Sequence, residues 1–160
     1  MKRLAIAMAI GSLMACGGAS GSSPAAPTAA ASPANIDGSY NATITASSTC
    51  AANLPAETRV LNYVANITQT GTAVQVQLLA HVIWNTVTVN GTVSGQTVNF
   101  STFSFSEITT ANGIALTATG TANVAADGSM TGTLSGNYQT PSGASCNSNV
   151  HQILMVKRPA

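Results

Sequence analysis

Hydrophobic and polar residues alternate with a period of two over most of the chain beyond residue 36. Near the start of this region Tyr40, Ala42 and Ile44 alternate with Asn and Thr residues. Alternation combined with β-branched enrichment is typical of half-buried strands and not of helices. The pattern predicts eight strands, over residues 39–46, 60–70, 73–84, 86–93, 97–107, 114–125, 129–139 and 150–158.

The fifth predicted strand changes parity along its length. Val98 and Phe100 lie on one face, whereas Phe103 falls on the opposite one. One extra residue in a strand restores a common face, so we expect a β-bulge near position 101 or 102.

Tight turns and two long loops connect these strands. Gly tolerates positive φ, so four dipeptides that end in Gly are hairpin signals. The longer connections cover residues 47–58 and 140–149 and contain Cys50 and Cys146, respectively. The hairpin signals are Thr70-Gly71, Ser94-Gly95, Asn112-Gly113 and Asp127-Gly128.

The N-terminus has the layout of a secretory signal peptide. Lys2 and Arg3 precede an apolar run of about eleven residues that ends at Met14, which is short for a transmembrane helix of roughly 20 residues. The sequence around Cys16, "LMAC", resembles the lipobox of bacterial lipoproteins. An ordinary secretory signal with a free Cys16 thiol is the alternative.

The lipobox resemblance implies a role for Cys16. Residues 1–15 would be a signal peptide, and Cys16 would become the acylated first residue of the mature protein. Several acyl chains hold a protein firmly on a membrane, because each buried methylene contributes about 0.8 kcal/mol. Gly17, and not Asp, follows the cysteine. By the same resemblance we expect a lipid-anchored protein of the bacterial cell envelope, sorted to the outer membrane.

If Cys16 carries lipid, Cys50 and Cys146 remain as a pair. In an oxidising compartment such a pair usually becomes a disulfide, with two free thiols as the alternative. This disulfide joins the loop after the first strand to the loop before the last, and those strands are neighbours only if the sheet closes. We therefore predict an all-β, eight-stranded antiparallel up-and-down barrel, with a β-sandwich as the alternative. A transmembrane barrel is a further rival, but the chain has few aromatic residues for interfacial girdles.

Gly38-Ser39-Tyr40 resembles the G-x-W motif of lipocalins and other calycins, with Tyr in place of Trp. The resemblance implies a calycin-like barrel. It also implies that a basic residue of the last strand packs across the Tyr40 ring. Arg158 is the expected partner, and Lys157 could also take this place.

Composition changes sharply at about residue 35. Residues 17–35 consist almost wholly of Gly, Ala, Ser, Pro and Thr, so 16–35 should be a lipidated cysteine followed by a disordered tether. Residues 36–160 then form one barrel domain.

The charge of the chain is small. Beyond residue 15 there are three basic and four acidic residues, a net charge of 3 − 4 = −1. No basic stripe is present, which argues against a nucleic-acid partner.

The sequence contains few candidate groups for catalysis or metal binding. The four acidic residues are scattered, and no paired carboxylates, nucleophile motif or cysteine–histidine cluster stands out. His81 and His151 fall opposite the main apolar face of their strands, so we expect surface histidines. The sequence predicts no enzyme activity, no cofactor and no metal site.

The inward face is apolar but rich in Ala and Gly, so the barrel is either filled or able to hold a small ligand. The first expected function is binding of a small hydrophobic ligand in the barrel. The second is a structural role, or contact with an envelope protein partner through the loops. Trp84, at a strand end, is placed at the mouth. The candidate interior or ligand-lining residues are Tyr40, Tyr63, Trp84, Phe100, Leu116, Met130, Leu134 and Tyr138.

Overall fold

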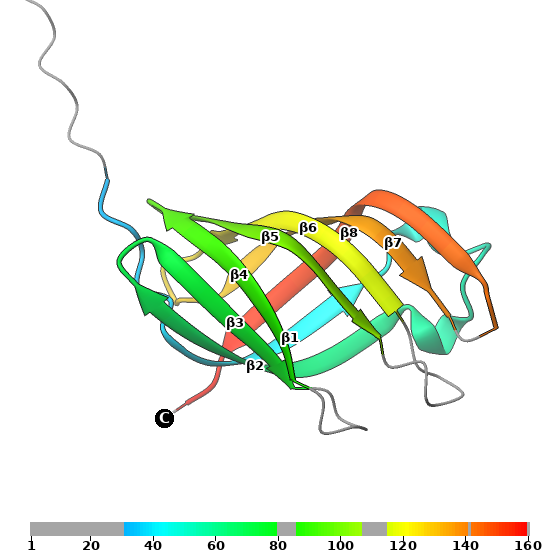
Figure 1. Cartoon of the computed structure of the whole chain (residues 1–160), viewed down its shortest axis with the longest axis horizontal. Helices are drawn as coiled ribbons and strands as arrows, with labels where there is room; N and C mark the ends of the chain where they lie inside the picture. The colour runs from blue at the N-terminus through cyan, green and yellow to red at the C-terminus, as the bar shows by residue number, and fades with distance from the viewer. Residues whose placement is uncertain (1–30, 80–85, 107–114, 141, 160) are drawn as a thin grey trace, which may run out of the picture.

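The computed structural model describes residues 31–79, 86–106, 115–140 and 142–159. Eight antiparallel strands form a closed barrel in which each strand pairs with its sequence neighbours and β1 pairs with β8 (Figure 1). The predicted up-and-down barrel is therefore confirmed. The strands are β1 Gly38–Thr45, β2 Val60–Thr70, β3 Ala73–Leu79, β4 Thr86–Ser94, β5 Thr97–Ser106, β6 Ala115–Val124, β7 Met130–Gln139 and β8 Ser145–Lys157.

Period-two alternation places one face of every strand inside the barrel. In β3, for example, Val74, Val76 and Leu78 are buried while the residues between them are exposed. The expected β-bulge in β5 is confirmed, because the pairing with β6 shifts register between Phe100 and Phe103. This shift keeps both phenylalanines buried.

The last strand differs from the prediction in two ways. β8 begins at Ser145, five residues earlier than expected, and its pairing with β7 shifts between Gly136–Ser148 and Leu134–His151. Three residue steps in β8 thus match two in β7, which is a second β-bulge. The bulge changes the parity of the strand, so Cys146 and His151 are both buried although one number is even and the other odd.

The two ends of the barrel are built differently. The turn end carries the short β2–β3, β4–β5 and β6–β7 connections together with the start of β1 and the end of β8 (Figure 1). Gly71, Gly95 and Gly128 have positive φ in these turns. The loop end carries the connection 46–59, which includes the 3-10 helices η1 (Ser48–Cys50) and η2 (Ala56–Thr58), and the connection 140–144.

The segment before β1 closes the turn end. Ile36 is fully buried, and its carbonyl oxygen accepts a hydrogen bond from the Tyr40 hydroxyl at 2.9 Å. Gln69 in β2 holds the same segment, because its side chain accepts from Ile36 N–H and donates to the Ala34 carbonyl. Ala34 N–H donates to the Gly95 carbonyl at 2.7 Å. Residues 34–37 are thus a strap fixed across the turn end.

Candidate functional site at the loop end

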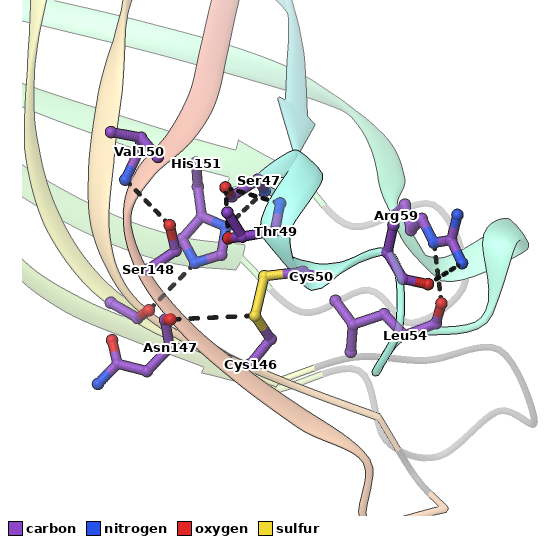
Figure 2. Close-up of a disulfide and its surroundings, with 12 residues drawn as sticks. Ser47, Thr49, Cys50, Leu54, Arg59, Cys146, Asn147, Ser148, Val150 and His151 are labelled. Atoms are coloured by element: carbon purple, nitrogen blue, oxygen red, sulfur yellow. Dashed lines mark hydrogen bonds between the residues drawn. A yellow bond between two sulfur atoms is a disulfide. The ribbon is translucent and has the colours of Figure 1, made fainter.

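A disulfide joins Cys50 in η1 to Cys146 in β8, with a Cα–Cα distance of 5.6 Å and a sequence separation of 96. This confirms the predicted pairing. Figure 2 shows the bond where η1 lies against the start of β8. The chain leaving β1 is therefore fixed covalently to the last strand, at the loop end of the barrel.

His151 makes a second link between the same two segments. Its side chain is fully buried, and its Nδ1 accepts a hydrogen bond from Ser47 N–H at 3.0 Å (Figure 2). Because Nδ1 accepts, the neutral ring carries its proton on Nε2, which donates to the Gly136 carbonyl at 3.1 Å. The Tyr138 ring packs beside it, with centroids 5.5 Å apart.

The prediction of a surface histidine is wrong for His151. The face of the last strand opposite His151 carries Val150, Leu154 and Val156, whose side chains are 41 to 46% exposed, so the apolar residues on that face do not mark the barrel interior. The bulge in β8 turns the opposite parity inward. His81 lies outside the described residues.

Burial lowers the pKa of His151 below its ordinary value of 6.5, and the hydrogen bond to Gly136 opposes this shift. The unfolded chain therefore takes up the proton first as pH falls. We expect the melting temperature to fall as pH drops below about 6.5, through the range between the unfolded and folded pKa values.

Thermal unfolding followed by circular dichroism at pH 7.5 and pH 5 tests this expectation. A His151→Gln variant cannot titrate, so its melting temperature should change much less between these pH values. Equal acid sensitivity in both proteins would show that another group is responsible.

The predicted interior residues that the structure describes are either fully buried or a few per cent exposed. A fully buried side chain has no water-sized space next to it, either outside the barrel or inside it. Tyr63 and Phe100 retain 5% and 4% exposure, respectively. Trp84 lies outside the described residues, as does Cys16. The fully buried residues are Tyr40, Leu116, Met130, Leu134 and Tyr138.

The described residues line an apolar void of about 10 Å³ in the barrel interior. Small-molecule sites are typically about 300 to 1,000 Å³, so this void alone does not accommodate a ligand. It is lined by Ile44, Val76, Leu78, Val89, Phe100, Phe103, Ile153 and Met155.

The Tyr40 ring at the turn end lies near Lys157, whose Nζ is 5.9 Å from the ring centroid. Lys157 pairs directly with Tyr40 across the β1–β8 ladder, so the two residues share a face of the sheet. Arg158 follows β8 with the opposite parity, and its backbone N–H donates to the Ser39 carbonyl at 2.8 Å. Of the two basic residues suggested by the calycin resemblance, the structure therefore places Lys157 over the ring.

Burial raises the pKa of the Tyr40 hydroxyl, and the nearby Asp37 carboxylate adds to this effect. The hydroxyl donates to Ile36, so it remains a neutral donor that helps to hold the strap in place.

A groove of about 650 Å³ lies on the outer surface at the loop end. Arg59 lines it, and Val60 and Val150 are exposed there at 50% and 45%. No sequence pattern indicates this groove, because its walls come from positions about 90 residues apart. The lining residues are Thr45, Ala46, Ser47, Ser48, Ala51, Ala56, Arg59, Val60, Val150 and Gln152.

The described residues contain no cluster of three or more His, Cys, Asp or Glu side chains that could hold a metal ion. They also contain no helix long and apolar enough to cross a membrane.

Comparison with protein-family models, with curated proteins and with solved structures gives no match for this chain.

Proposed function

We propose that this protein is a lipid-anchored lipoprotein of the bacterial cell envelope, at the outer membrane, and that its barrel is a non-enzymatic module for contact with another envelope protein. The observation that carries the interaction role is the close packing of the interior side chains within the part of the barrel that the structure describes. Tyr40, Met130, Leu134 and Tyr138 are fully buried, and the void that the described residues line is about 10 Å³. Recognition through the outer surface fits this packing better than recognition through the interior.

The strap at residues 34–37 supports a definite orientation for such a module. A tether attached to Cys16 would meet the barrel at the turn end, where Ala34 is bonded to Gly95 and Gln69. The roughly 17 residues between Cys16 and this point would span on the order of 23 Å root-mean-square. The disulfide and the groove lie at the opposite end, so they would face away from the membrane.

A small hydrophobic ligand inside the barrel is the second candidate function. One observation favours it: all eight residues that line the interior void are apolar. To reach the volume of a typical ligand site, this void would have to widen at least about thirtyfold, by displacement of side chains such as Phe100 and Phe103.

Native mass spectrometry of the protein purified from its own host distinguishes the two functions. The interaction role predicts the mass of the lipidated chain alone. Cross-linking in intact cells should then recover a protein partner attached to residues of the loop end. A stoichiometric co-purifying lipid that leaves on unfolding would contradict the interaction role and support the ligand.

Replacing the proposed anchor gives the strongest test of the envelope assignment. A Cys16→Ser chain cannot be acylated at this position, so it should move from the membrane fraction to the soluble fraction, while the wild-type chain stays with the membrane. Membrane binding by a single acyl chain is already marginal, so loss of all chains should release nearly all of the protein. A Cys16→Ser protein that folds and remains in the membrane would refute the anchor. Circular dichroism establishes whether it folds.

A further inference from the structure

The loop-end groove opens where the wall of the barrel is interrupted. The ladder between β1 and β8 ends at the pair Thr45–Gln152, and β2 begins opposite Thr45 at Val60. Beyond this point the chain leaves β1 through the buried Ser47 and enters η1. The strand that separates β8 from β2 thus ends at the groove, which lies between the two.

The β8 backbone at the groove has an unusual set of partners. Val150 lies in the bulge and has no partner in the described ladders with β1 or β7. Its N–H donates to Ser148 Oγ at 3.2 Å, and its carbonyl accepts from Gln152 Nε2 at 3.1 Å. Side chains of the same strand therefore satisfy these two groups. A peptide backbone can replace such side chains by β-strand addition.

Arg59 supplies a positive charge to this groove. Its Nε donates to the Leu54 carbonyl at 2.8 Å and its Nη2 to the Ala51 carbonyl at 2.6 Å, which holds the guanidinium in place (Figure 2). No ion pair joins Arg59 to a carboxylate within the part of the chain that is described, although Glu57 is only two residues away. A guanidinium has five N–H donors, so further donors remain for a ligand.

We propose that this groove binds the C-terminal end of an extended peptide. Its carboxylate would accept hydrogen bonds from Arg59, and its last aliphatic side chain would pack against Val60 and Val150. Its backbone would pair with β8 at Val150. Arg favours carboxylates because its planar fork matches their geometry. That the peptide belongs to another envelope protein rests on the proposed function. The binding chemistry of the groove does not.

The probe is an N-acetylated tetrapeptide of two alanines followed by two valines, with a free C-terminal carboxylate. It is titrated into the purified, isotope-labelled full chain in detergent micelles and followed by amide chemical shifts. We expect saturable shifts at Ser48, Val150 and Gln152, with a dissociation constant between about 10 μM and 1 mM. The same peptide with an amidated C-terminus should bind at least about tenfold more weakly, because a hydrogen bond to a charged group is lost.

Three variants locate the interaction. Arg59→Gln should weaken binding of the free acid at least about tenfold and bring it close to that of the amide. Val150→Asp places a carboxylate beside that of the peptide and should also weaken it. Arg158→Gln removes a cation at the turn end and should leave binding unchanged. Thermal unfolding of each variant separates lost binding from lost structure.

The proposal is overturned by the absence of saturable shifts up to about 5 mM peptide. It is equally overturned by equal binding of acid and amide, or by shifts confined to the barrel interior. None of these results alters the membrane fractionation of the Cys16→Ser chain. Failure of the groove and failure of the envelope assignment can therefore be told apart.

Discussion

A chain with Ser in place of both Cys50 and Cys146 is expected to lose about 4 kcal/mol of its free energy of unfolding. The disulfide closes a loop with a sequence separation of 96. For a loop of about 100 residues the chain-entropy model gives roughly 4.7 kcal/mol at 25 °C, and removal of native disulfides typically costs about 2 to 5 kcal/mol. Equilibrium unfolding in urea, followed by far-ultraviolet circular dichroism, measures the loss.

The loss should be accompanied by local opening at the loop end. Ser47 N–H donates to His151, and the disulfide holds the neighbouring η1 against β8. Hydrogen exchange of the Ser47 amide should therefore accelerate more than exchange of amides at the centre of β6. A Cys16→Ser chain is the control and should keep the wild-type stability. A loss below about 1 kcal/mol for the double variant would contradict the cross-linking role.

Replacing Gly132 by Ala is expected to cost about 3 kcal/mol, the upper part of the range for overpacked interiors. A Cβ at this position would collide with the Thr121 carbonyl oxygen and lie 2.5 Å from the Ala122 Cα. Both atoms belong to the backbone of β6, which pairs with β7 there. Because the obstructing atoms are backbone atoms, no change of side-chain rotamer relieves the collision, and the two strands must separate.

Gly71 is the matched control for this substitution. A Cβ there meets nothing within 4 Å, but φ is +60°. Gly71→Ala therefore carries only the backbone cost of a left-handed residue, about 1 kcal/mol. Equilibrium unfolding of the two variants should show a loss at Gly132 clearly larger than that at Gly71. Similar losses would mean that β6 and β7 move apart at little cost.

The barrel could be predicted because its local pattern and its long-range evidence agreed. Alternation located the strands, and the parity change between Phe100 and Phe103 located a bulge. The two cysteines in separate loops indicated closure, which the disulfide confirms. Alternation thus located the strands, and the cysteine pair indicated how the sheet closes.

The last strand shows where this reasoning fails. Residues 145–149 contain only Cys146 as an apolar residue, so alternation gave no signal for a strand there. Farther along, both faces of the strand carry apolar residues, so alternation did not show that the face with Ile153 and Met155 is the buried one. His151 was misplaced for the same reason. The groove at Arg59 could not be predicted, since it requires knowledge of which backbone atoms lack a neighbouring strand.

The hydrogen bond from Arg158 N–H to the Ser39 carbonyl joins the last residues of the barrel to the first. It continues the β1–β8 ladder, which closes the eight strands into a ring in which every neighbour along the chain is also a neighbour in space. Such a ring has no structurally required starting point. A circularly permuted chain, opened at the Asp127–Gly128 turn and joined between residues 159 and 36 by a short linker, would contain the residues of all eight ladders. The barrel itself therefore does not require the break in the chain to lie between β8 and β1.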